Sequence, residues 1–353
     1  MEITPETGSS RSATLMLHLL GQCNLTCLHC YMEGSPLRRE QLPLERVLAA
    51  IGVSAQLDIG ALYLTGGEPL LYPGLHQVLQ KAAEVPGLEI TVCTNATLTT
   101  PRHVAALQAA GARASISVDG EPEFHDRFRD SAGAFRATEN GIRLLNEAGV
   151  PITIISTISR ANVASLAWLV EWAQRMGASQ FRAQPLLRLG RALEIVDQYL
   201  SQAQVERLVL QLSDLANRYR STGMRCSIIG QNRPGLLKHP CGAYVCNGGG
   251  CHRRVEKEIK KLVVREDGTV LPEATNLDHS YAIGDFTREP LPDMVARYFE
   301  DGGYARFDRL CRSAFEEVLP TWKCVVVPWD QIVAERSHMA RSVESSQLAH
   351  AAG

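Results

Sequence analysis

Residues 22–31 read QCNLTCLHCY and place Cys23, Cys27 and Cys30 in one short segment. The segment follows an apolar, strand-like run over residues 14–20. Thiolates are the preferred ligands of iron–sulfur clusters, and a cubane cluster contains four irons. Three local cysteines would bind three of these irons and leave the fourth open to another ligand. The spacing therefore predicts a 4Fe–4S cluster with one open iron.

Two other interpretations of this segment have to be weighed. A structural zinc site takes four ligands, and His29 is too close to Cys30 in the sequence to be an easy fourth. Three buried cysteines with no common ligand are the plainer alternative. The segment lies at the C-terminal end of a predicted strand, the edge where active sites of parallel α/β folds gather. This position favours the cluster.

Composition narrows the class of protein. The chain has 353 residues, ten cysteines and a formal net charge of −2. This charge gives no reason to expect nucleic acid or an anionic membrane as a partner. The apolar run 13–20 is too short to span a bilayer, and no basic segment with a cleavage site precedes it. We expect a cytoplasmic protein, in which cysteines are more often metal ligands than disulfides.

The pattern over residues 13–190 alternates strand-like and helix-like segments. Six βα units predict a parallel sheet with right-handed crossovers. They favour an incomplete (β/α) barrel over a flat doubly wound sheet, although spacing alone does not decide this. The expected strands are residues 14–20, 61–65, 89–94, 112–118, 151–158 and 180–185, and the expected helices are 43–56, 74–83, 101–110, 134–148 and 163–176.

The rhythm changes after residue 190. A long helix is expected over residues 202–221, a strand over 224–229, a hairpin from 261–265 to 270–272, and helices near 292–299 and 304–317. Residues 231–252 are rich in Gly, Pro and Cys. We therefore divide the chain into a flexible tail (1–12), a (β/α)6 core (13–190), a cysteine-rich α+β extension (191–335) and a second flexible tail (336–353).

A second motif follows the second predicted strand. Residues 64–69 read LTGGEP, and Gly66 and Gly67 permit close backbone approach and positive φ. Exposed carbonyls at the strand end accept hydrogen bonds from an ammonium group, and Glu68 adds a further acceptor. A plain βα turn ended by proline is the alternative. Beside the cysteine segment, the motif predicts a pocket for a zwitterionic amino acid next to the open iron.

Together the two motifs resemble those of radical S-adenosylmethionine (radical SAM) enzymes, over roughly residues 14–190. The resemblance implies a partial (β/α)6 radical SAM barrel, a 4Fe–4S cluster and S-adenosylmethionine, whose amino and carboxylate groups bind the open iron. It also implies that one electron, from a donor such as a flavodoxin or ferredoxin, cleaves S-adenosylmethionine. The resulting 5′-deoxyadenosyl radical then abstracts a hydrogen atom from the substrate.

Further strand ends match positions of this family. Asn95, Ser117 and Asp119 are plausible contacts to ribose or carboxylate, and turn formation explains the same residue types equally well. The family often has glycine where this chain has Ala96. Cys93, one residue before Thr94, is expected to be a buried, inert thiol. The sequence identifies no catalytic residue.

The C-terminal cysteines resemble the twitch and SPASM extensions that hold auxiliary clusters in this superfamily. The family pattern expects a cysteine where this chain has Glu273, so a full SPASM set is not predicted. One auxiliary cluster is favoured, because the glycine-rich run 246–251 is poor core material. A degenerate site with free thiols is the alternative. The candidate ligands are Cys241, Cys246, Cys251, Cys311 and Cys324.

Residues 124–129 (FHDRFR) and 133–135 (GAF) resemble a stretch common in peptide-maturing members, although that branch often has Ser where this chain has Ala134. This stretch and the extension indicate the peptide-maturase-like branch. The leading hypothesis is cross-linking, epimerisation or oxidation of a ribosomally made peptide, with a possible separate partner for peptide recognition. Modification of a small molecule or a tetrapyrrole side chain is the alternative within enzymes. A non-catalytic iron–sulfur carrier is the alternative from another class, and it would not require the Gly-Gly-Glu motif.

Overall fold

The computed structural model describes residues 13–240, 243–244 and 259–351. Its main feature is a ten-stranded sheet in the order β11-β10-β9-β1-β2-β3-β4-β5-β6-β7, with a separate pair of short strands, β8 and β12. The first six strands are β1 (Ala13–His18), β2 (Ile59–Thr65), β3 (Glu89–Thr94), β4 (Arg113–Ser117), β5 (Ile152–Ile158) and β6 (Gln180–Pro185).

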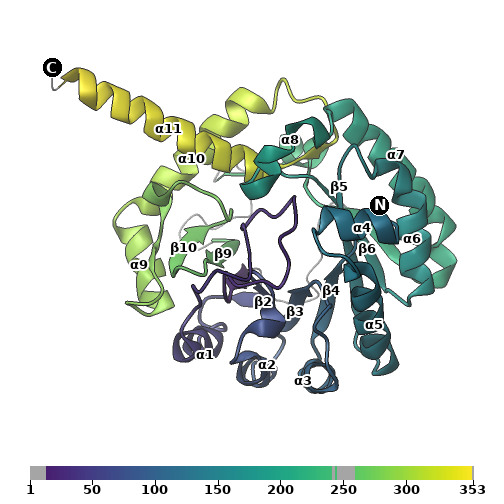
Figure 1. Cartoon of the computed structure of the whole chain (residues 1–353). Helices are drawn as coiled ribbons and strands as arrows, with labels where there is room; N and C mark the ends of the chain where they lie inside the picture. Colours follow the sequence, from purple (N-terminus) through teal and green to yellow (C-terminus); the bar gives the residue numbers. More distant parts are fainter. Residues whose placement is uncertain (1–12, 241–242, 245–258, 352–353) are drawn as a thin grey trace.

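The winding of these six strands decides between the two predicted architectures. They pair in parallel and in chain order. Right-handed crossovers that never reverse direction put every helix on one face of the sheet, and the sheet curves around the other face. Figure 1 shows this arrangement, with α1, α2, α3 and α5 outside the strands. The predicted partial barrel is thereby confirmed.

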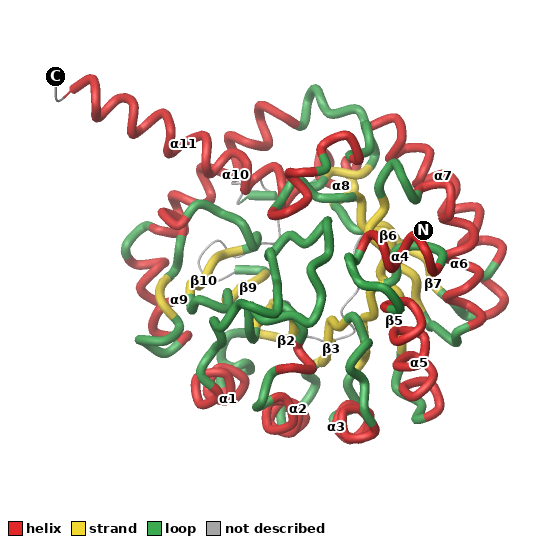
Figure 2. The backbone as a smooth tube through the Cα atoms, in the orientation of Figure 1, coloured by secondary structure: helices red, strands yellow, loops and turns green. Residues whose placement is uncertain are grey.

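Helices of the core surround the strands as an outer layer (Figure 2). The structure adds one short helix that the sequence pattern did not predict, α4, in the loop after β4. The core helices are α1 (Leu44–Gly52), α2 (Leu75–Ala83), α3 (Pro101–Ala109), α4 (Pro122–Phe128), α5 (Ala134–Glu147) and α6 (Leu166–Arg175).

The main core lies between the sheet and these helices. Alternate residues of each strand point to the helix side, because successive side chains of a strand face opposite ways. Leu17, Leu62, Val92, Ile116 and Phe181 are fully buried there. The other residues of the same strands face the interior of the barrel, so the two faces differ in composition as well as in position.

The extension after residue 190 continues the same sheet. β7 (Arg225–Ile228) pairs in parallel with β6, and β9 (Lys261–Val264) pairs in parallel with β1 on the other side. The predicted hairpin is present as β9 and β10 (Thr269–Pro272), which pair antiparallel. β11 (Gly284–Asp285) then forms one edge of the sheet.

The remaining elements of the extension are mostly helical. They are α7 (Gln202–Arg218), α8 (Arg233–Lys238), α9 (Leu291–Glu300), α10 (Gly303–Val318), α11 (Trp329–Ala351), β8 (Gln231–Asn232) and β12 (Val326–Val327). Helix α11 continues through most of the segment 336–353, for which we expected a flexible tail. Its Ala-, Glu- and Arg-containing sequence favours helix even where few apolar residues repeat. The tail predicted over residues 1–12 lies outside the described residues.

None of the helices in the described residues is both long enough and apolar enough to cross a bilayer.

Replacement of Leu62 by alanine tests the packing of the sheet on the helices. We expect Leu62→Ala to lower the free energy of unfolding by about 2–5 kcal/mol, because a fully buried side chain leaves a cavity. Leu210→Ala is the matched control, since Leu210 is 70% exposed and should change stability by less than about 0.5 kcal/mol. Urea unfolding followed by circular dichroism measures both, and equal losses would contradict the described core.

Candidate functional site

The cysteine loop, residues 21–35, leaves the C-terminal end of β1 and carries the three predicted cluster ligands. Cys23 and Cys27 are buried with Leu25 in a small cluster apart from the main core, and Cys30 packs against it. The loop is held in shape by its own backbone, with the N–H of Cys23 donating to Ser35 O at 3.0 Å. The structure therefore brings the three thiols together.

Each of the three sulfurs has an N–H group beside it. The pairs are Leu25 N with Cys23 Sγ at 3.4 Å, Gly34 N with Cys30 Sγ at 3.4 Å, and Arg129 Nη1 with Cys27 Sγ at 4.0 Å. N–H groups directed at ligand sulfurs stabilise negative charge there and tune the reduction potential of an iron–sulfur cluster. These N–H groups would stabilise the sulfurs once a bound metal has displaced their protons.

The pKa values of Cys23 and Cys27 are raised in this site. Burial raises the pKa of Cys23 to about 12 and that of Cys27 to about 11. Thiols with such pKa values stay protonated at neutral pH until a bound cation displaces the proton. Three neighbouring sulfurs with N–H donors, two of them buried, thus fit a cationic iron centre, and they are the residues that would hold the 4Fe–4S cluster.

A single metal ion fits the described residues less well. No three His, Cys, Asp or Glu side chains among them surround a point where one ion would sit. In a cubane cluster each cysteine binds a different iron, so the sulfurs are held further apart than around one ion.

The turn after β2 lies directly against the cysteine loop. The N–H of Gly67 donates to Leu20 O at 2.7 Å, and that of Glu68 donates to Gln22 O at 2.9 Å. A Cβ on Gly67 would lie 2.1 Å from Gln22 O, and one on Gly66, where φ is +131°, would lie 2.5 Å from Leu20 O. Only glycine permits this approach. The two glycines therefore dock the turn on the loop.

Glu68 is fully buried and already has protein partners on both oxygens. Its Oε1 accepts from the Thr94 hydroxyl at 2.6 Å and from Leu70 N at 3.1 Å, and its Oε2 accepts from Asn95 N at 2.9 Å. Burial raises the pKa of Glu68, and these hydrogen bonds oppose the shift. In this structure Glu68 ties the ends of β2 and β3 together; a direct contact to an ammonium group stays a prediction.

The end of β3 reaches the cysteine loop through Asn95. Its Nδ2 donates to Asn24 Oδ1 at 3.0 Å and lies 4.0 Å from Cys23 Sγ. The next residue, Ala96, has φ of +59°, a left-handed conformation that favours glycine. The backbone at this turn is therefore the kind that glycine adopts most easily, and Ala96 holds it at some conformational cost.

Asp119, two residues after Ser117 at the end of β4, is fully buried in an ion pair. Its Oδ2 accepts from Arg129 Nε at 2.9 Å and Nη2 at 2.8 Å, and its Oδ1 accepts from Thr157 N at 2.9 Å. His29 Nε2 of the cysteine loop lies 3.6 Å from Oδ2. Burial alone would raise the pKa of Asp119, but Arg129 and His29 outweigh it and the net shift is downward.

Arg129 thus joins the Asp119 carboxylate to the Cys27 sulfur, and sequence reasoning missed this role. Arg129 is buried, at 5% exposure, so its charge acts through little solvent. Its only sequence signal is an arginine in a charged stretch after the fourth strand, which does not distinguish a buried arginine from an exposed one.

A second unpredicted contact comes from the residues after β6. Arg191 donates from Nε to Cys27 O at 2.8 Å and from Nη2 to Gly34 O at 3.0 Å, and its N–H donates to Cys30 O at 3.1 Å. Gly190, with φ of +55°, leaves room for the loop, since a Cβ there would lie 2.4 Å from Cys30 O. Arg191 therefore clamps the cysteine loop from the far end of the core.

The predicted auxiliary cysteines are only partly visible. Cys241, Cys246 and Cys251 lie outside the described residues. Cys324 and Cys226 are buried in the main core, and Cys226 lies on β7. The structure therefore neither assembles nor excludes the predicted auxiliary site.

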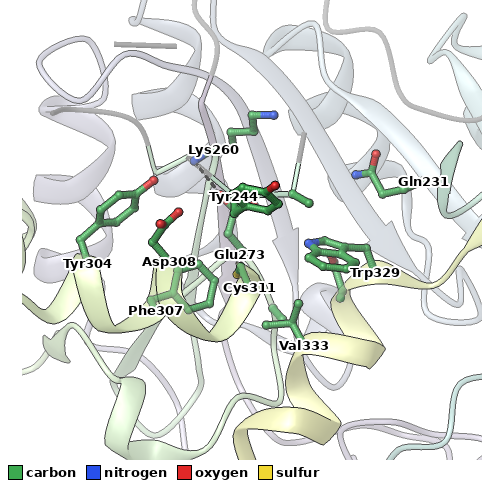
Figure 3. Close-up of a pocket in the computed structure, with 13 residues that line it drawn as sticks. Gln231, Tyr244, Lys260, Glu273, Tyr304, Phe307, Asp308, Cys311, Trp329 and Val333 are labelled. Carbon is green, nitrogen blue, oxygen red and sulfur yellow. Dashed lines mark hydrogen bonds between the residues drawn. The ribbon is translucent and has the colours of Figure 1, made fainter. Parts of the chain in front are cut away.

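Cys311, on α10, lines a pocket between the extension helices and the β9–β10 hairpin (Figure 3). Glu273, at the position where the SPASM pattern expects a cysteine, lines the same pocket, together with Asp308 and Tyr304. Glu273 Oε1 accepts from Lys260 N at 2.9 Å. Cys324 is not among the lining residues. Cys311 and Glu273 thus line one cavity, and their role as ligands of an auxiliary cluster stays a prediction.

Comparison with known proteins identifies the class. Residues 18–173 match the family model of the radical SAM superfamily. The match begins at the last residue of β1 and includes the cysteine loop, the Gly66–Gly67 turn and the ends of β3 and β4. The chain therefore carries a radical SAM domain over these residues, and such a domain implies a 4Fe–4S cluster and S-adenosylmethionine.

The relatives include several AdoMet-dependent heme synthases, proteins of peptide maturation and a probable GTP 3′,8-cyclase. An AdoMet-dependent heme synthase of Methanosarcina barkeri is 34% identical over 194 residues, 54% of this chain and 55% of that protein. The sporulation killing factor maturation protein SkfB of Bacillus subtilis is 31% identical over 179 residues, 50% of this chain and 43% of that protein. A PqqA peptide cyclase of Granulibacter bethesdensis is 29% identical over 172 residues, 47% of this chain and 45% of that protein.

The chain thus spans about half the length of the curated relatives that it matches. SkfB and the PqqA peptide cyclase agree with the predicted peptide-maturase-like branch. Among solved structures, anSMEcpe with bound AdoMet superposes with a TM-score of 0.65 at 15% identity and covers 96% of this chain and 99% of its own. At that identity the likeness supports the fold alone.

Gly67→Ala tests the docking of the turn on the cysteine loop. We expect loss of most of the bound iron, because the added Cβ would displace the backbone at Gln22, next to Cys23. Iron and sulfide content after anaerobic reconstitution measures the effect. Gly52→Ala is the control, since its Cβ would meet only Lys81 Cε at 3.7 Å. A Gly67→Ala protein with full iron content would contradict the described contact.

Arg129→Gln tests the charge beside Cys27. Removal of a buried positive charge disfavours the added electron, so we expect the cluster's midpoint potential to become more negative. Redox titration followed by electron paramagnetic resonance measures it. Arg129→Lys keeps the charge and should shift the potential less, and Arg127→Gln, at an exposed position, should not shift it. Equal potentials in all four proteins would show that Arg129 has no electrostatic role.

Proposed function

We propose that the chain is a radical SAM enzyme that cleaves S-adenosylmethionine reductively. The observation that carries this proposal is the set of three neighbouring thiols, two of them buried and each with an N–H donor, beside a glycine turn that tolerates no side chain. When bound, the cluster and S-adenosylmethionine supply a 5′-deoxyadenosyl radical that abstracts a hydrogen atom from the substrate.

The chain's own residues position and enclose this chemistry. Glu68 joins two strand ends, and Asn95 extends from one of them to the cysteine loop. Ser117 and Asp119 stand at the next strand end, where we propose that they contact the ribose or carboxylate of S-adenosylmethionine. Buried polar groups with fixed partners need no reorganisation during the reaction, and a site closed to water protects a radical from side reactions.

Three further features are part of the proposal. The electron comes from a small donor protein such as a flavodoxin or ferredoxin. The protein works in the cytoplasm, where cysteines remain reduced. One auxiliary cluster, with Cys311 among its ligands, is retained as a hypothesis, because Cys311 and Glu273 face one cavity.

For the substrate we propose a ribosomally made peptide, which the enzyme cross-links, epimerises or oxidises. The relatives SkfB, a killing-factor maturation protein, and the PqqA peptide cyclase support this choice. The second candidate is a tetrapyrrole side chain, which the heme synthase relative favours. Both candidates use the same radical, so the substrate is decided by what the barrel interior binds.

Cleavage of S-adenosylmethionine tests the proposed reaction. Wild-type protein, reduced with dithionite under anaerobic conditions, should form 5′-deoxyadenosine and methionine, detected by liquid chromatography and mass spectrometry. Cys27→Ala should abolish both products because it removes a cluster ligand. Cys226→Ala is the matched control and should retain them, since Cys226 packs in the core on β7.

Two outcomes would contradict the proposal. A wild-type protein with full iron content that never forms 5′-deoxyadenosine, with or without candidate substrates, would favour a non-catalytic iron–sulfur carrier. Cleavage that persists in Cys27→Ala would refute the assigned cluster site. The substrate is tested separately, by mass change in peptides encoded beside the gene and in tetrapyrroles bearing propionate side chains.

A further inference from the structure

The interior of the barrel is lined by polar side chains. Residues that face away from the helices alternate with the core residues along each strand. Strand register places these residues in rows across neighbouring strands. The pairs on this face include His18 with Thr65, Cys93 with Ser115, Ser117 with Ile155, and Ile155 with Arg182. Cys93 thus lies on the interior face and not in the main core.

Several strand cations stand on this interior face, among them Lys261, Arg113 and Arg182, and they differ in their partners. Lys261 of β9 forms an ion pair with Asp330 of α11. Arg182 of β6 has no carboxylate partner among the described residues, and its Nε is buried without a hydrogen-bond partner. Taking a guanidinium N–H out of water without a partner costs free energy. The Nε–H of Arg182 carries this free-energy cost in the structure. We take this as an indication that its partner is a molecule outside the described chain.

The neighbours of Arg182 could serve the same partner. Tyr63 of β2 lies across the interior within reach of Arg182, whose charge opposes the effect of burial on the pKa of the Tyr63 hydroxyl. The same charge acts on the Cys93 thiol. These groups face one space from β2, β3 and β6. A hydroxyl donor and a guanidinium across one space form a suitable pair for a carboxylate.

Arg182 also lies close to the S-adenosylmethionine site. It shares a row with Ser117, two strands away, which corresponds to about 10 Å at the usual strand spacing. Along β6 it precedes Gln184 by two residues and so lies roughly 7 Å deeper in the barrel than the strand end. A substrate held there would lie beneath the cofactor and on the side away from the helices.

We propose that Arg182 binds a carboxylate of the substrate inside the barrel, with the Tyr63 hydroxyl as a second donor. This inference rests on the proposed function and specifies its substrate class, a molecule with a carboxylate near the carbon that loses hydrogen. Acidic side chains of a peptide and propionates of a tetrapyrrole share this chemistry. The buried Nε of Arg182, which has no hydrogen-bond partner, distinguishes this position from Lys261, which pairs with Asp330, and from Arg113, which hydrogen-bonds Ser179.

Binding of two carboxylate probes tests the inference. One probe is iron coproporphyrin III, which has four carboxylates, and the other is a labelled peptide of alternating Glu and Ala. Their neutral analogues are the tetra-amide and the peptide with Gln in place of Glu. Affinities are measured anaerobically on the protein with its cluster and S-adenosylmethionine, by absorption for the tetrapyrrole and fluorescence anisotropy for the peptide.

We expect one of the two carboxylate probes to bind more tightly than its own neutral analogue. Whether this probe is the peptide or the tetrapyrrole indicates which of the two is the substrate class. Arg182→Gln should weaken that probe about 10- to 100-fold, the usual effect of losing a hydrogen-bonded charge. Tyr63→Phe should weaken it less, and Arg182→Lys should be intermediate. Arg175→Gln is the control, because Arg175 is an exposed arginine of α6, outside the sheet and 4.0 Å from Glu171 Oε1, and it should leave binding unchanged.

Iron content and melting temperature of each variant establish that it has folded. The inference would be overturned if the wild type bound neither carboxylate probe more tightly than its neutral analogue. It would also be overturned if a folded Arg182→Gln protein bound the carboxylate probe with the same affinity as the wild type. Failure of the proposed function is separate, since it is measured as the lack of 5′-deoxyadenosine in the wild type without either probe.

Discussion

The close backbone contact between the Gly66–Gly67 turn and the cysteine loop is the constraint on which the site depends. Two N–H groups of the turn donate to carbonyls of the loop, at distances that exclude any side chain between them. Because the turn also carries Glu68, the contact fixes the loop relative to β2 and, through Glu68, relative to β3. The two glycines thus fix the positions of the cysteine thiols, the ends of β2 and β3, and the Glu68 carboxylate relative to one another.

A buried ion pair between Asp119 and Arg129 is the second feature that shapes this region. The Asp119–Arg129 pair is almost fully buried, and such pairs are costly unless both groups keep several hydrogen bonds. Here Asp119 also accepts from Thr157 N, and Arg129 faces Cys27 Sγ. The pair therefore places a fixed positive charge next to one cluster ligand. A buried pair of this kind adds little to the free energy of unfolding. A fixed positive charge at this position would instead favour the reduced state of a cluster bound there.

The sequence predicted the strands of the core closely, because each combines apolar alternation with a turn signal at its end. β3 and β6 have the expected limits, and the β9–β10 hairpin follows its Gly turn. Cysteine spacing likewise predicted the loop. Arg129 and Arg191 could not be predicted, because burial and partners of an arginine depend on contacts between distant segments. Glu68 was recognised by its motif, whereas its hydrogen-bond partners on β3 were visible only in the structure.

The contact of Arg191 with the cysteine loop has a consequence for the order of events in the cell. Arg191 lies 164 positions after Cys27, so the ribosome makes the three cysteines long before the residue that clamps them. Until β6 has been added, the loop has neither this clamp nor the space that Gly190 leaves for it. A cluster bound as proposed would therefore enter a preformed loop only after the core is complete, and a nascent chain would expose three thiols to oxidation until then.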